Sequence, residues 1–139
     1  MKPLAKRKAD RNSKYWQNKS MALWRELVVW KWGGKCAVNN FVTKCAGPLQ
    51  AHHLITRSVK HLQHSVENGV CLCAKHHIFC HKLSTHGAPM AFSQWFHDAF
   101  PERWEWVDQN KWTVKPPDAQ ADYERLLGLK MPVERPRML

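Results

Sequence analysis

Apolar residues recur at helical spacing in the first third of the chain, after a polar and basic start. Ser20 suits an N-cap position and Gly33-Gly34 suits a helix end, so the sequence predicts a helix between them. The apolar positions of this helix are Leu23, Trp24, Leu27 and Val28. Residues 1–19 show little periodicity, and we expect them to form a flexible basic arm.

Two short apolar segments in the middle of the chain predict a β-hairpin. The second segment follows an Asn68-Gly69 pair, which is a turn signal, and a helical pattern comes directly after it. On such a helix His77 and His81, at positions i and i+4, share one face. The predicted elements are strands at 49–55 and 70–72 and a helix at 74–83.

Proline residues mark the boundaries in the C-terminal half. Pro89 suits the first turn of a helix, and Pro101 ends that helix before one further turn. Asp118 suits the cap of a short helix through Leu127. The aromatic residues at helical spacing, which we expect in the core, are Phe92, Trp95, Phe96 and Phe100. The chain thus divides into an arm at 1–19, a core domain at 20–115, and a C-terminal helix and tail at 116–139.

The net charge of the chain indicates which class of binding partner to expect. The chain of 139 residues carries a net charge of +11, and residues 1–35 hold ten Lys and Arg against Asp10 and Glu26. A surplus of this kind favours a polyanion such as nucleic acid, although a basic tail can also serve only for solubility. No apolar run is long enough to cross a membrane and no signal core follows the N-terminus, so we expect a cytoplasmic protein without a membrane partner.

The His-rich stretch predicts a metal site. A His pair one turn apart on a helix can bind one divalent ion, and His52 or His53 can supply a third ligand. Consecutive residues on a strand point to opposite faces, so these two neighbours need different roles. A His has the intrinsic pKa of a general base, and the carbonyl of Asn68 could orient it. Four further His residues, which we expect outside this site, are His61 and His64, facing DNA or solvent, and His86 and His97, in structural positions.

Residues 49–81 resemble the HNH, or ββα-metal, endonuclease family, including its colicin nuclease branch with three His ligands. The resemblance implies an α+β fold with a ββα-metal core, in which a short antiparallel hairpin plus helix is surrounded by additional helices. It implies a general base at His53, an orienting Asn68, and metal ligands at His52, His77 and His81. The cofactor would be a divalent metal such as Mg²⁺, Mn²⁺, Ni²⁺ or Zn²⁺.

Many members of this family also hold a structural zinc ion. The corresponding ligands here would be Cys36, Cys45, Cys73 and His76, with His76 in place of the usual fourth Cys. Eight residues separate the first two ligands where the family has two, so ordinary buried cysteines are the alternative. We expect the remaining two, Cys71 and Cys80, to be core thiols.

The resemblance implies a metal-dependent DNA endonuclease that hydrolyses phosphodiester bonds, by nicking and by double-strand cleavage. Similar small members are encoded by phages, which implies the host cytoplasm, and a terminase or another DNA-processing protein as partner. The alternatives are a non-catalytic zinc-stabilised DNA-binding module and an RNA-directed nuclease, and the oligomeric state stays open. The residues expected to contact the DNA backbone are Arg57, Lys75, Lys82, Lys6, Arg7, Lys8 and Arg11.

Overall fold

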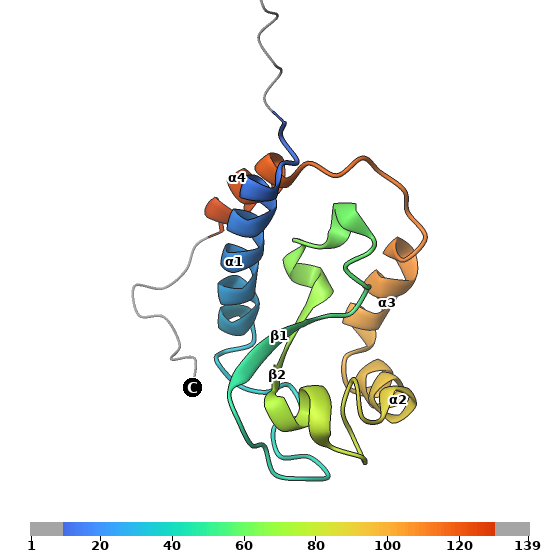
Figure 1. Ribbon diagram of the computed structural model, residues 1–139. Helices are drawn as coiled ribbons and strands as arrows, with labels where there is room; N and C mark the ends of the chain where they lie inside the picture. The colour runs from blue at the N-terminus through green and yellow to red at the C-terminus, as the bar shows by residue number, and fades with distance from the viewer. Residues whose placement is uncertain (1–9, 130–139) are drawn as a thin grey trace, which may run out of the picture.

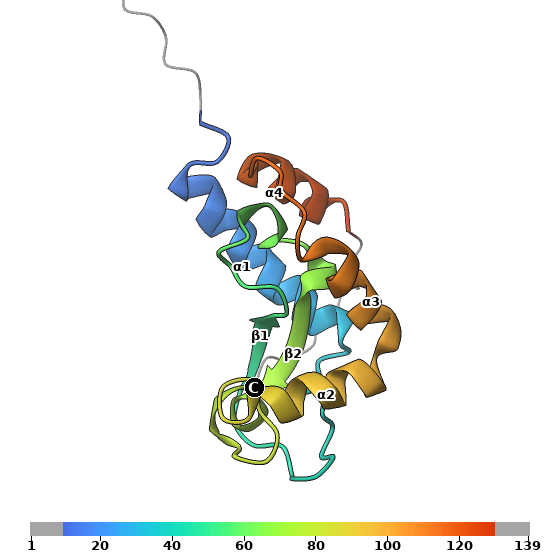
Figure 2. The same cartoon turned by 90° about the vertical axis from the view of Figure 1, so that its right-hand side faces the viewer.

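A two-stranded antiparallel hairpin lies at the centre of the computed structural model, which describes residues 10–129. Strand β1 (Leu49–His53) pairs with β2 (Gly69–Cys73), so that Leu49 lies opposite Cys73 and His53 opposite Gly69. Helices cover the hairpin on both sides, as Figures 1 and 2 show. The fold is therefore a small α+β fold, as predicted.

The helices form two groups. Helices α1 and α4 lie side by side on one flank of the hairpin, and α2 and α3 lie on the other (Figure 1). Three short turns, η1, η2 and η3, occupy the segments next to β2. The bounds are α1 Lys14–Lys31, η1 Lys60–Leu62, η2 Val66–Asn68, η3 Lys75–Phe79, α2 Pro89–Ala99, α3 Pro101–Asn110 and α4 Ala119–Leu127.

Helix α1 begins six residues before the predicted start at Ser20. Its N-cap is Ser13, whose hydroxyl accepts a hydrogen bond from the backbone N–H of Trp16 at 3.5 Å. Ser20 is buried inside the helix and donates to the carbonyl of Ala119 at 2.7 Å, which fastens α4 to α1. The expected arm at 1–19 is therefore wrong in its second half, and residues 1–9 lie outside the described part of the chain.

Strand β2 is buried along its whole length, because helices pack on both of its faces. Val70 and Leu72 lie in one apolar cluster with Phe92 and Phe96 of α2. Gly69 lies so close to α1 that an added Cβ would come within 2.2 Å of a Val28 methyl group. Glycine at this position thus permits the close approach of strand and helix.

Three side chains hold the backbone that leads into β2. The indole N–H of Trp24 donates to the Ser65 carbonyl at 2.7 Å, and that of Trp32 donates to the Gly69 carbonyl at 3.0 Å. Arg103 of α3 donates to the Gly69 carbonyl as well, at 3.1 Å. Because α1 and α3 are tied to the same few carbonyls, both helix groups fix the position of the hairpin.

The proline and cap predictions for the C-terminal half are confirmed in part. Helix α2 begins at Pro89, and the Asp118 carboxylate caps α4 by accepting from the Ala121 N–H at 3.0 Å. Helix α3 is longer than the single turn expected after Pro101, since it runs to Asn110. Among the residues that the structure describes, no helix has the length and hydropathy to cross a membrane.

His64 is fully buried, which corrects the expectation that it faces DNA or solvent. Its Nδ1 lies 2.8 Å from the Asp122 carboxylate of α4, and Arg125 donates to the same carboxylate at 3.0 Å. His61 is half-buried and lies 2.8 Å from the Thr113 hydroxyl. The loop between the strands is therefore packed against the C-terminal half.

Replacing Asp122 with Ala is expected to lower the free energy of unfolding by about 1–3 kcal/mol, because it leaves His64 buried without its partner. Asp98→Ala is the matched control, since it breaks the exposed His97–Asp98 pair and should leave unfolding nearly unchanged. Urea denaturation of both variants makes the comparison. Equal stability of the two variants would contradict a stabilising role for the buried pair.

Candidate functional site

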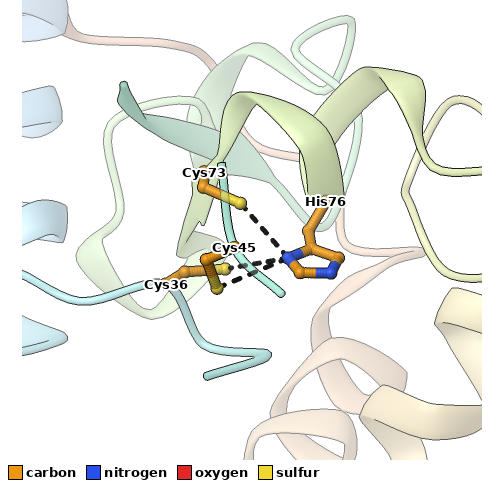
Figure 3. A group of neighbouring side chains, drawn as sticks. All are labelled: Cys36, Cys45, Cys73 and His76. Carbon is orange, nitrogen blue, oxygen red and sulfur yellow. Dashed lines mark hydrogen bonds between the residues drawn. The ribbon is translucent and has the colours of Figure 1, made fainter. Parts of the chain in front are cut away.

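Three cysteines and one histidine meet where the hairpin joins η3. Cys36 and Cys45 come from the loop between α1 and β1, Cys73 ends β2, and His76 lies on η3. Figure 3 shows the three sulfur atoms directed at one side of the imidazole ring. Their distances from His76 Nδ1 are 3.7 Å for Cys36, 3.6 Å for Cys45 and 3.2 Å for Cys73. All four predicted residues are thus brought together.

This geometry fits a metal ion better than it fits hydrogen bonds. A single ring nitrogen has one lone pair or one proton, so it cannot serve three thiols at once. A tetrahedral ion bound to sulfur and nitrogen holds these atoms about 3.6 Å apart, which is close to the observed spacing. The other nitrogen of His76 lies 2.8 Å from the Thr43 hydroxyl, a contact that can fix the ring with Nδ1 facing the thiols. The cluster can therefore bind a metal ion.

The pKa values of the buried thiols differ from one cysteine to the next. Burial raises the pKa of Cys36 to about 12. Burial acts in the same direction on Cys73, but hydrogen bonds from the backbone of His76 and Ala46 lower its pKa overall. Cys71, which lies outside the cluster, is fully buried, and burial raises its pKa to about 12. Cys71 is therefore a core thiol, as predicted.

A second cluster contains only histidines. His52 of β1, His77 of η3 and His86 of the following loop place their ring nitrogens within 4.8 Å of one another. His52 Nδ1 lies 3.2 Å from His77 Nε2, close to the roughly 3.3 Å between two nitrogens on one tetrahedral ion. His77 donates its other ring proton to the side-chain oxygen of Gln50, which leaves Nε2 free as a ligand.

His81 does not join this cluster, contrary to the sequence prediction. The predicted α-helix at 74–83 is a π-helical turn that ends at Phe79, so the i, i+4 relation is lost. The chain then folds back, and the N–H of His86 donates to the His77 carbonyl at 3.1 Å. His86 thereby takes the third place in the cluster, while His81 is exposed outside it.

Two imidazoles of this cluster, those of His52 and His77, are suited to bind a cation as neutral ligands. Burial, followed by the neighbouring His77 and His86, lowers the pKa of His52 to about 3. Burial and His86 also lower the pKa of His77. Since a ligand nitrogen must be unprotonated, metal binding at neutral pH requires little proton release from these two residues.

His53 lies beside this cluster but faces different partners. Its Nε2–H donates to the backbone carbonyl of Gln63 at 2.8 Å, and its ring stacks on Trp24 with centroids 4.0 Å apart. In the neutral ring Nδ1 therefore carries the lone pair. Burial lowers the pKa of His53 to about 4, with smaller contributions from nearby cations including Arg57 and Arg25. At neutral pH the His53 ring is therefore unprotonated, with the lone pair of Nδ1 available.

Asn68 does not orient His53 directly, which corrects the expectation from the sequence. Its buried side chain accepts from the Ile55 N–H at 2.6 Å and donates to the carbonyls of Ile55 and Leu62. These bonds close the loop between the strands. The carbonyl that orients His53 belongs to Gln63, and no side-chain pattern in the sequence marks a backbone carbonyl.

His53 and the cluster of His52, His77 and His86 line the same cleft, which has a volume of about 550 Å³. Arg57, which was predicted to contact DNA, lines this cleft, and so does Arg25 of α1, which was not predicted from the sequence. Lys75 and Lys82 do not line it, and Arg11 pairs with the Asp118 carboxylate at 2.9 Å instead. The predicted contacts Lys6, Arg7 and Lys8 lie outside the described residues. The cleft residues are Arg25, Ala51, His52, His53, Leu54, Thr56, Arg57, His77 and His86.

Cys45→Ser is expected to remove one tightly bound metal ion per chain, because it deletes one of the four cluster ligands. Cys71→Ser, a change of the same chemistry outside the cluster, should retain that ion. Elemental analysis after dialysis against a weak chelator measures both. Retention of the ion by Cys45→Ser would exclude the assigned ligand set.

His86→Ala should weaken the binding of a second divalent ion by about tenfold or more, whereas His81→Ala should not change it. Calorimetric titration with Ni²⁺ measures this affinity, in protein whose cluster of three cysteines and His76 already holds Zn²⁺. If His81→Ala bound Ni²⁺ more weakly than His86→Ala, the result would contradict a ligand role for His86 and support the pair of His77 and His81 predicted from the sequence.

Known proteins offer no assignment for these two clusters. No protein-family model, no curated protein and no solved structure matches the chain. A function therefore has to be inferred from the side chains themselves. The informative arrangement is a carbonyl-oriented histidine beside a three-histidine cluster in a cleft with two arginines.

Proposed function

We propose that this chain is a metal-dependent DNA endonuclease with a ββα-metal (HNH) core. One observation carries the proposal: His53, whose free Nδ1 is set by the Gln63 carbonyl, shares a cleft with His52, His77 and His86. A metal ligand set alone would suit many proteins. An oriented base next to that set is what hydrolysis requires and what simple DNA binding does not.

The two clusters suit different ions. The three thiols and one imidazole of the first cluster suit a structural Zn²⁺, because soft ligands in a closed tetrahedral set prefer it. The residues His52, His77 and His86 would hold a catalytic divalent ion with positions left open for other ligands. When bound, that ion supplies a Lewis acid for the charge that develops on the phosphate and the leaving oxygen.

His53 would act as the general base. Its Nδ1 takes a proton from a water molecule, whose oxygen attacks phosphorus, and the bond to the 3′-oxygen breaks. The leaving 3′-oxygen takes a proton from solvent water, so the products are a 5′-phosphate and a 3′-hydroxyl. The negative charge that develops at the phosphate would raise the pKa of His53 from about 4, since an opposite charge favours the imidazolium, whereas the divalent ion would act in the opposite direction.

The charges of the cleft agree with a phosphodiester substrate. Arg25 and Arg57 line it, no Asp or Glu among the described residues does, and the whole chain carries a net charge of +11. Contacts between arginine side chains and the phosphates of the DNA backbone give affinity, but they do not recognise the base sequence. One site cuts one strand, so nicking is the simplest activity, and double-strand breaks follow from a second visit or a second copy.

His53→Ala should reduce the nicking of supercoiled plasmid by a factor of about 10² to 10⁴, the usual contribution of a general base. Its affinity for DNA should persist, because the cationic residues are untouched. His97→Ala, an exposed histidine paired with Asp98, is the control and should cut normally. Gel analysis with Mg²⁺, Mn²⁺, Ni²⁺ and Zn²⁺ gives the rates.

Two outcomes would redirect this assignment. Binding of plasmid by the wild-type chain without cutting in any of the four metals would favour a zinc-stabilised DNA-binding module. Faster digestion of RNA than of duplex DNA, measured side by side, would favour an RNA-directed nuclease.

A further inference from the structure

A second, smaller pocket adjoins the cleft. It encloses about 250 Å³, and two of its residues, Arg25 and Arg57, also line the larger cleft. The two hollows are therefore neighbours that share a cationic boundary. The residues of the smaller pocket are Gln17, Asn18, Met21, Arg25, Arg57 and Gln63.

Gln63 is the unusual member of this pocket. Only 2% of the residue is exposed, yet its side-chain Nε2 has no hydrogen-bond partner among the described residues. A buried amide donor without a partner costs about 1–3 kcal/mol of stability, so such groups are rare unless a ligand satisfies them. The backbone of the same residue already has a role, since its carbonyl orients His53.

The pocket suits an anion with oxygen atoms. It contains two guanidinium groups and three side-chain amides, and neither an Asp nor a Glu of the described chain lines it. Within residues 10–129, neither Arg25 nor Arg57 takes part in an ion pair. Amide N–H groups and unpaired guanidinium groups are the donors that bind phosphate oxygens.

We propose that this pocket binds the backbone phosphate next to the one that is cut. Gln63 then has two roles: its carbonyl orients His53, and its amide donates to the adjoining phosphate once the side-chain amide rotates its N–H groups towards the pocket. Arg25 and Arg57 stand between the two phosphates and can contact either. The proposal rests on the nuclease function above and adds a position along the DNA strand that fixes the substrate in the cleft.

The test separates binding from stability. Gln63→Met keeps the length of the side chain and removes the amide, while the backbone carbonyl of residue 63 is retained. The affinity for a fluorescently labelled 20-base-pair duplex, measured by anisotropy in the His53→Ala background to prevent cutting, should fall roughly tenfold, as expected for a lost hydrogen bond to a charged group. The melting temperature should stay unchanged or rise, because an unsatisfied buried amide is gone.

Gln109→Met is the matched control, since Gln109 lies on exposed α3 outside both pockets. Arg25→Gln gives a second, surface-exposed test: the slope of log affinity against log salt concentration should fall by about 0.9. Lys111→Gln, which also removes one positive charge, controls for the general field and should change that slope less.

A Gln63→Met affinity equal to that of the Gln109→Met control, with Arg25→Gln and Lys111→Gln also alike, would overturn the phosphate pocket even if the chain cuts DNA. Failure of the wild-type chain to cut DNA, together with weaker binding by Gln63→Met, would contradict the nuclease and support the pocket. The two proposals therefore fail in different measurements.

Discussion

The pairing of Leu49–His53 with Gly69–Cys73 is the constraint on which the rest of the structure depends. Its register places Leu49 opposite Cys73 at one end and His53 opposite Gly69 at the other. The end with Leu49 and Cys73 lies at the cluster of Cys36, Cys45, Cys73 and His76. The end with His53 lies at the cleft that the histidines and two arginines line. A shift by one residue would turn His52 and His53 to exchanged faces, so the same hydrogen bonds that hold the hairpin also assign these two histidines their different partners.

The loop between the strands then determines the orientation of the His53 ring. Asn68 closes that loop on itself, while Trp24 holds the Ser65 carbonyl and Asp122 holds the ring of His64. Gln63 lies between these anchors, and its carbonyl meets His53 at 2.8 Å. The C-terminal helix α4 and the N-terminal helix α1 thus contribute to the orientation of a side chain that belongs to neither. Such support from distant elements is what keeps a reactive group in one tautomer.

Sequence reasoning predicted the features that depend on local chemistry. The hairpin, the start of α2 at Pro89 and the Asp118 cap follow from residue types at short spacing, whereas the four-residue Cys and His cluster was implied by the family resemblance. The wrong predictions concern residues whose positions depend on contacts between segments distant in the sequence. His81 was expected as a ligand because i, i+4 pairs share a helix face, but the π-helical turn ends at Phe79 and brings in His86. His64 is buried because α4 packs against its loop. The residues around His64 in the sequence do not predict this contact.

We propose that one hairpin supports two metal sites of different chemistry, one structural and one in the cleft. Anomalous diffraction from crystals of the zinc-loaded protein soaked in Mn²⁺ tests it most directly, with data collected at the absorption edges of both metals. We expect a zinc peak among Cys36, Cys45, Cys73 and His76 and a manganese peak among His52, His77 and His86. A zinc peak alone, with no density for a second metal between those three imidazoles, would contradict it.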